Sequence, residues 1–270
     1  TRPCQADAAG LQSITASQLG DAFQVRADNA LVGLEGRAAL MRRLGEVIAA
    51  QPDVFGSADG PARPGRLFDH LLRSGDTSDE IRTTIAATDI LGLVLSALSP
   101  VWPAQNALVD ETGQSVALGD CWRHSAAPGQ GLDAGWMPFH KLSQWLTYSL
   151  LEPFEWAGIA VTGLDALTGL PEYRNGGLLL DGGVLAFKDP GQALQTWRAG
   201  DELIVEWRAL TVALLDELAP LVRGALGLNA QQMPLACVLE GGTWATGRVL
   251  AQALRGGTPP LNIQSDGTVF

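Results

Sequence analysis

The sequence predicts a mainly α-helical protein with one small β-hairpin. Apolar residues recur three and four positions apart over several long segments, which is the spacing of one helix face. Strands and helices do not alternate as in a parallel sheet, and neither glycine-rich phosphate-binding motif occurs. Because 46% of the 270 residues are hydrophobic, the chain can bury a substantial core. We expect residues 1–270 to form a single domain.

Three helices are expected in the first half of the chain. Residues 36–50 show helical spacing, and Pro52 follows them. A second helix spans residues 66–73. A third is expected over residues 78–98, because an acidic residue stands in its first turn and Pro100 stops it.

The middle of the chain predicts a loop and then a helix. Residues 124–135 are rich in Gly, Ala, Ser and Pro, which is typical of an exposed loop. Pro138 stands where the first residue of the next helix is expected. Pro153 should kink or end that helix near Glu152, because proline removes a backbone donor.

The hairpin is expected at residues 177–187. Two short apolar runs there surround Asp181-Gly182-Gly183, a pattern typical of a tight turn between strands. Helices are expected again at residues 201–226 and 243–254. The remaining tail is rich in turn residues and should be extended.

Charge and cysteine content exclude several classes of partner. The net charge of −11 argues against nucleic acid and anionic membranes, which require excess Lys and Arg. The longest apolar run, residues 90–98, is too short to span a bilayer, and no secretory signal opens the chain. Cys4, Cys121 and Cys237 form no C-x-x-C pair, and only three histidines are present. We expect a cytoplasmic protein without metal or cofactor.

The densest polar cluster of the chain is the first candidate site. It consists of Glu172, Tyr173, Arg174 and Asn175, between Pro171 and the pair Gly176-Gly177. A carboxylate beside a fixed cation, with glycines that let a ligand approach the backbone, is typical of a site for a small polar substrate. The alternative is a capped loop with a surface ion pair.

A polar strip on the helix after Pro138 is the second candidate. His140, Gln144 and Tyr148 are spaced i, i+4 and i+8, so they share one face, and Lys141 lies beside them. We interpret the strip as the lining of a cleft. A solvated helix face is the alternative.

A third cluster contains Asp120, Trp122 and His124. On a helix, Asp120 and His124 would be one turn apart, and an Asp that orients a His is a common acid–base arrangement. The alternative is an N-capping Asp with a structural His. Cys121 has no clear basic neighbour, so we do not expect a nucleophile there.

Several long motifs, in order, resemble the uracil catabolism protein 4 family of fungi and bacteria. They are FQV…NALVGLEGR, LGDCWRH, MPFHKLSQWLTYSLLEPFEWAG, LTGLPEYRNGGLLLDGGVL, LEGGTWATGR and the ending SDGTVF. Family members carry a further N-terminal portion, so the resemblance implies that residues 1–270 are the C-terminal part of a longer protein. It also implies a place in the pathway that degrades uracil through a ribosylated intermediate and eventually releases urea.

A more distant similarity is to the queuosine 5'-phosphate N-glycosylases. Lys141 and Gln144 match the K-x-x-Q pattern of that family, and Glu172, Tyr173 and Arg174 match its acid-Tyr-Arg motif. The acid of that family is Asp and is the catalytic carboxylate. Glu172 is one methylene longer, which changes its reach to the sugar carbon. We expect a DNA-glycosylase-like helical domain.

The resemblances imply cleavage of the N-glycosidic bond of a ribosyl-urea 5'-phosphate, a small-molecule substrate. Glu172 would stabilise or attack the charge at ribose C1, and His140, or else His124, would protonate the leaving nitrogen. The substrate-binding residues would be Arg174 or Lys141 for phosphate, Gln144 and Asn175 for the ureido group, and Trp122 or Trp145 for a wall, with Asp120, Tyr148 and Tyr173 nearby. Two alternatives stay open: an amidohydrolase that cuts the ureido group, and a non-catalytic module that binds a nucleotide.

Overall fold

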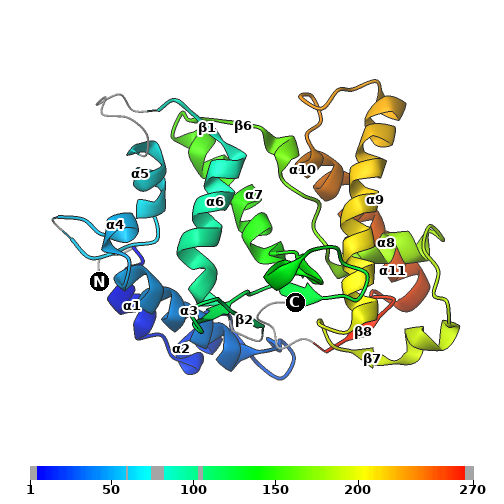
Figure 1. Cartoon of the computed structure of the whole chain (residues 1–270), viewed down its shortest axis with the longest axis horizontal. Coiled ribbons are helices and arrows are strands. Elements are labelled where there is room, and N and C mark those ends of the chain that lie inside the picture. The colour runs from blue at the N-terminus through cyan, green and yellow to red at the C-terminus, as the bar shows by residue number, and fades with distance from the viewer. Residues whose placement is uncertain (1–4, 59, 74–81, 103–105, 265–270) are drawn as a thin grey trace. The chain divides into compact units, whose positions relative to one another are not determined.

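The computed structural model describes residues 5–58, 60–73, 82–102 and 106–264, and these are mainly α-helical (Figure 1). The fold class predicted from the sequence is therefore confirmed. The chain divides into two compact units, one of residues 1–119, 150–162 and 266–270, the other of residues 120–149 and 163–265. The single domain expected over residues 1–270 stays a prediction.

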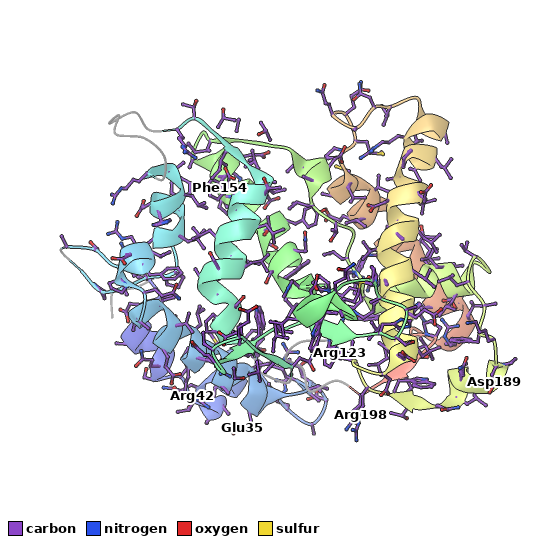
Figure 2. The ribbon with its side chains drawn as sticks, in the orientation of Figure 1. Glu35, Arg42, Arg123, Phe154, Asp189 and Arg198 are labelled. Carbon is purple, nitrogen blue, oxygen red and sulfur yellow. The ribbon has the colours of Figure 1, made fainter. Side chains whose placement is uncertain are left out.

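The first unit is built from short helices and two small strand pairs. Its helices are α1 (Ala8–Gln12), α2 (Ala16–Ala22), α3 (Leu34–Ala49), α4 (Pro52–Phe55), α5 (Arg66–Arg73), α6 (Ala87–Leu98) and the 3-10 turn η1 (Ser99–Val101). Strands β1 (Thr84–Ala86) and β6 (Ala160–Thr162) pair in parallel, and β2 (Ala107–Val109) and β3 (Ser115–Ala117) are antiparallel. Arg42 on α3, labelled in Figure 2, donates to the Ile14 carbonyl at 2.9 Å.

The first two helices predicted from periodicity are confirmed as α3 and α5. The start predicted for the third helix is wrong, because α6 begins at Ala87. The residues just before it pair with β6 as a strand, and this long-range pairing has no local signal. Residues 78–81 of the predicted helix lie outside the described residues.

The second unit contains the longest helix and the candidate site. Its strands are β4 (Cys121–Arg123) with β5 (Trp136–Pro138), antiparallel, and β7 (Thr196–Trp197) with β8 (Asn262–Ile263), parallel. Its helices are α8 (Tyr173–Asp181), α9 (Glu202–Leu226), α10 (Leu235–Cys237), the π-helical segment η5 (Val238–Trp244) and α11 (Ala245–Arg255), with 3-10 turns η2 (Gly131–Asp133), η3 (Leu164–Ala166) and η4 (Pro190–Leu194). Helix α7 (Lys141–Trp156) begins in this unit, and its residues from Leu150 onward belong to the first.

The structure contradicts a helix start at Pro138 and a helix end at Pro153. Pro138 is the last residue of β5, where it pairs with Cys121, and is not the first residue of the helix. Pro153 lies inside α7, which continues to Trp156 and does not end near Glu152. The loop expected at 124–135 and the long helix, α9, are confirmed.

The hairpin predicted at residues 177–187 is wrong, because α8 continues to Asp181. Gly182 caps this helix, and Gly183 follows in the left-handed region with φ of 71°, so the glycine pair is a helix stop. Gly176 lies inside α8, where a Cβ would stand 2.6 Å from the Trp207 ring of α9. The glycine allows α8 and α9 to pack closely.

Helix α8 also packs against α11, so α8, α9 and α11 lie side by side (Figure 1). The final helix predicted from residue 243 starts earlier, because η5 runs directly into α11. No helix in the described part of the chain is both long and apolar enough to cross a membrane.

We predict that Gly176→Ala destabilises the protein by about 1–3 kcal/mol, because the added methyl group overpacks the α8–α9 contact. Gly224→Ala is the matched control: it lies in α9 with open space around its Cβ, so it should raise stability by up to about 1 kcal/mol. Urea denaturation measures both. Equal stability of the two variants would contradict the packing role.

Candidate functional site

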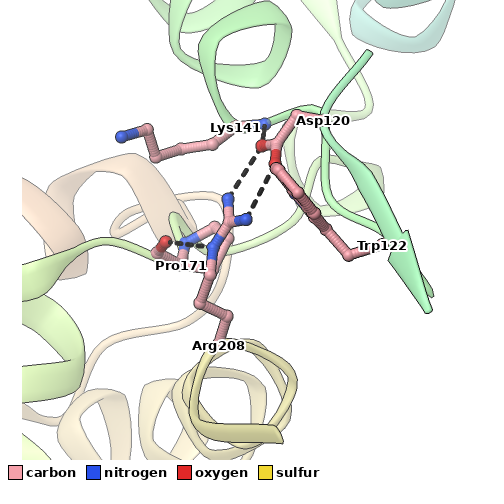
Figure 3. Close-up of polar contacts among 5 residues, drawn as sticks. All are labelled: Asp120, Trp122, Lys141, Pro171 and Arg208. Atoms are coloured by element: carbon pink, nitrogen blue, oxygen red, sulfur yellow. Dashed lines mark hydrogen bonds and ion pairs between the residues drawn. The ribbon is translucent and has the colours of Figure 1, made fainter. Parts of the chain in front are cut away.

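A buried ion pair joins Asp120, which precedes β4, to Arg208 on α9 (Figure 3). Both guanidinium–carboxylate distances are 2.7 Å, and the two side chains are 7% and 1% exposed. The carboxylate also accepts hydrogen bonds from Trp122 Nε1 at 2.8 Å and from the Lys141 amide at 3.0 Å. These contacts offset the loss of hydration that both charges suffer on burial.

The ion pair keeps Asp120 ionised. Burial on its own raises the pKa of this carboxyl, but the hydrogen bonds and charge of Arg208, with the bonds from Trp122 and Lys141, outweigh burial and hold the pKa below its ordinary value. Arg208 also donates from Nε to the Pro171 carbonyl at 3.1 Å (Figure 3). The ion pair therefore fixes the residue that immediately precedes Glu172.

Glu172 is the N-cap of α8. Its Oε2 accepts from the Arg174 amide at 2.9 Å and its Oε1 from the Asn175 amide at 2.7 Å. Burial raises the pKa of Glu172, and these two hydrogen bonds, followed by the charges of Lys141 and Arg174, limit the increase. The result is a rigid, half-buried carboxyl group that takes up a proton more readily than an exposed one.

The charges of Arg208, Asp120 and Glu172 also act on the Lys141 ammonium group. Burial, and next the charge of Arg208, lower the pKa of its ammonium group, whereas Asp120 and Glu172 raise it by less. Its backbone contacts Asp120 while its side chain extends away from that contact (Figure 3). A carboxyl with a raised pKa and an amine with a lowered pKa, each acting on the other, are typical of functional sites.

His140 immediately precedes α7 in a strained conformation. Its φ of 46° is unusual for a residue with a side chain, and its amide donates to the Asp120 carbonyl at 3.0 Å. Burial lowers the pKa of the imidazole more than Asp120 raises it. A smaller fraction of the imidazole is therefore protonated at neutral pH, which makes His140 less available as a proton donor.

The polar strip on α7 faces a protein loop. Gln144 accepts from the Thr168 amide at 3.3 Å, and the Tyr148 hydroxyl donates to the Thr168 carbonyl at 3.0 Å. Burial raises the pKa of Tyr148. The solvated-face alternative is therefore wrong for these two residues. Trp145, on another face of α7, is 57% exposed.

The predicted pairing of Asp120 with His124 is wrong. The residues between them form strand β4, so the two side chains are not one helical turn apart. Asp120 instead binds Arg208, and His124 accepts from the Ala126 amide at its Nδ1 atom.

Two other candidates have structural roles. Trp122 is buried in a cluster with Phe139 and Val205, and its indole N–H donates to Asp120. Its apolar and polar contacts are thus both made within the protein. Asn175 is 1% exposed, its Nδ2 donates to Leu170 O at 3.1 Å, and its Oδ1 accepts from Thr243 Oγ1 at 2.8 Å. Both ends of this amide are engaged inside the protein, so it is not free to bind a ureido group.

The remaining two candidates lie at the start of α8. Tyr173 is 40% exposed, and the Arg174 guanidinium stands 4.8 Å from the centre of its ring. Arg174 also donates from Nη1 to the Gly257 carbonyl at 3.1 Å. Arg174 is therefore held in place beside Glu172 by contacts on two sides.

Sequence reasoning missed Arg208, the most buried charge of the site. A signal was present: Arg208 shares the buried face of α9 with Ile204, Thr211 and Leu215, at spacings of four, three and four. A lone arginine in such an apolar stripe indicates a buried partner, because an unpaired charge is very costly there.

Cys121 shows no sign of activation as a nucleophile. Burial, helped by Asp120, raises the pKa of Cys121 to about 11, so this thiol stays protonated at neutral pH. No three His, Cys, Asp or Glu side chains in the described ranges converge as metal ligands.

We predict that Asp120→Asn lowers the free energy of unfolding by about 3–5 kcal/mol, because Arg208 is left as a buried charge without its counter-ion. The control is Asp28→Asn, which breaks a surface ion pair whose side chains are 64% and 78% exposed, and should cost less than about 1 kcal/mol.

The pH dependence of the free energy of unfolding below neutral pH gives a second test of this ion pair. The folded-state pKa of Asp120 is depressed, so its contribution is present above the unfolded pKa and is lost as pH falls through the folded one. The difference in stability between wild type and Asp120→Asn should therefore shrink below about pH 4. A difference that stays constant down to pH 2 would contradict the account.

Comparison with known proteins identifies the family. A family model described as "Protein of unknown function (DUF1688)" matches residues 1–270. Protein urg3 of Schizosaccharomyces pombe is 38% identical over 270 residues, which cover 98% of this chain and 61% of that protein. Uracil catabolism protein 4 of Lachancea kluyveri is 38% identical over 283 residues, covering 96% of this chain and 62% of that protein. The chain spans about three fifths of the length of these curated relatives. The resemblance to the uracil catabolism protein 4 family is confirmed, and the chain belongs to the DUF1688 family.

Proposed function

We propose that this chain acts in uracil catabolism and cleaves the N-glycosidic bond of a ribosyl-urea 5'-phosphate. The name of the Lachancea kluyveri relative, uracil catabolism protein 4, supports the pathway. The observation that carries the chemistry is Glu172, a half-buried carboxyl group held by two backbone amides and influenced by the charge of Lys141.

In the proposed reaction the bond between ribose C1 and the urea nitrogen breaks, and its electron pair leaves with the nitrogen. Positive charge develops at C1, and the Glu172 carboxylate stabilises it. Water then adds to C1 and loses a proton, while the leaving nitrogen gains one. The products are urea and ribose 5-phosphate. Because Glu172 keeps its position through the Arg174 and Asn175 amides, little reorganisation is needed as the charge develops.

Lys141 is the proposed proton donor. The urea nitrogen is weakly basic, so it needs a proton from a group more acidic than an ordinary lysine, and the pKa of Lys141 is lowered. His140 is the second candidate, because burial lowers the pKa of its imidazole and so reduces the protonated fraction at neutral pH. Arg174 is the proposed phosphate ligand, since a guanidinium binds phosphate in a bidentate geometry.

We predict that Glu172→Gln lowers kcat for release of ribose 5-phosphate from ribosyl-urea 5'-phosphate by at least about 10²-fold. The control is Asp7→Asn, which alters another carboxylate N-cap, the one that accepts from the Gly10 amide in α1. Asparagine caps a helix about as well as aspartate, so Asp7→Asn should leave both stability and turnover close to wild type, whereas Glu172→Gln should lose turnover. Unchanged turnover in Glu172→Gln would remove Glu172 from the chemistry. Ligand binding without turnover in the wild type would favour a nucleotide-binding module.

The pH dependence of kcat provides a further prediction. Glu172 must be ionised to stabilise C1, and its pKa is raised, so kcat should fall on acidification with a midpoint above the ordinary value of 4.5. The charge of Arg174 lowers this pKa, so Arg174→Leu should move the midpoint of its residual activity to higher pH. A kcat midpoint at or below pH 4.5 that does not move in Arg174→Leu would contradict this role of Glu172.

A further inference from the structure

We propose that a cavity in the 120–149 and 163–265 unit binds a small organic cation whose N–H groups donate hydrogen bonds. The cavity has a volume of about 630 Å³, which is within the range of small-molecule sites. Its walls come from the end of α8, the segment through η4 and β7, and the first turns of α9. Asp189 and Arg198, labelled in Figure 2, lie near the two ends of that segment. Glu172 and Lys141 are not among its lining residues.

The charge of the lining favours a cation. The lining contains three carboxylates, those of Asp201, Glu202 and Glu206, and one ammonium group, that of Lys188. Backbone amides fix two of them: Arg198 N donates to Asp201 at 2.7 Å, and Ser125 N donates to Glu202 at 2.7 Å. The N-terminus of α9 opposes a cation with roughly half a positive charge, which is less than the excess of two negative charges.

Two acceptors at this cavity have no partner within the described part of the chain. Glu206 is half-buried and makes no hydrogen bond or ion pair with those residues. Gln192 Oε1 is buried and also lacks a hydrogen bond there. Because buried acceptors are normally paired, Gln192 Oε1 indicates a ligand that donates, and the Glu206 carboxylate lines the same cavity.

The aromatic walls agree with this choice. The indole N–H of Trp197 donates to Gln192 O at 2.9 Å, and that of Trp207 donates to Gly176 O at 3.1 Å. With their polar atoms engaged, these rings offer apolar surface, as Phe187 does, and ring faces attract cations. The ligand class is therefore a primary ammonium or guanidinium group on a short apolar body.

Calorimetry with three probes of one shape tests the proposal: phenethylamine, the neutral 2-phenylethanol and the anionic 3-phenylpropionate. Phenethylamine should bind, the alcohol should bind at least about 10-fold more weakly, and the acid should not bind. Glu206→Gln should weaken phenethylamine at least about 10-fold. Glu217→Gln, at an exposed position of the same helix, should leave its affinity unchanged.

Gln192→Met separates binding from folding, because it removes an unpaired acceptor and should weaken phenethylamine without lowering the melting temperature. Glu172→Gln should leave phenethylamine binding intact, so a failure of the proposed function would not affect this result. The proposal is overturned if phenethylamine does not bind, if the alcohol binds equally well, or if Glu206→Gln and Glu217→Gln behave alike.

Discussion

The ion pair between Asp120 and Arg208 is the constraint on which the candidate site depends. Two charges that are almost fully buried are tolerated only when every polar atom around them is satisfied, and here the carboxylate binds Arg208, Trp122 and the Lys141 amide. The same guanidinium holds the Pro171 carbonyl. One interaction thus orders the start of α7, which supplies Lys141, and Pro171, the residue before Glu172.

The environment created by this arrangement explains the shifted pKa values. Burial raises the pKa of Glu172 and lowers that of Lys141, and each residue partly offsets the shift of the other through its charge. A capping carboxylate on the surface would not have a pKa raised by burial, and its charge would be screened from a neighbouring lysine by water. The N-cap role and the proposed catalytic role of Glu172 are therefore compatible, because the two amides that cap α8 also hold the carboxylate still.

Local periodicity was sufficient to predict α3, α5 and α9, because their apolar faces repeat over several turns. It failed at α8, where Gly182-Gly183 resembled a hairpin turn but end the helix. The helix also packs through Gly176 against the Trp207 ring 31 positions away, a contact that no local pattern contains. Arg208 was missed for a related reason, since its partner Asp120 is 88 positions distant. Glu172 and Lys141 were proposed from short motifs, and the charge of each shifts the pKa of the other, whereas Asp120 and His124 are separated by a strand.

A crystal structure with ribose 5-phosphate would test the central claim most directly. The account predicts that ribose C1 lies about 3–3.5 Å from a Glu172 carboxylate oxygen, with Asp120 still bound to Arg208 and the phosphate on Arg174. A sugar bound elsewhere in the protein, with the Glu172 carboxylate contacting only its own helix amides, would contradict it.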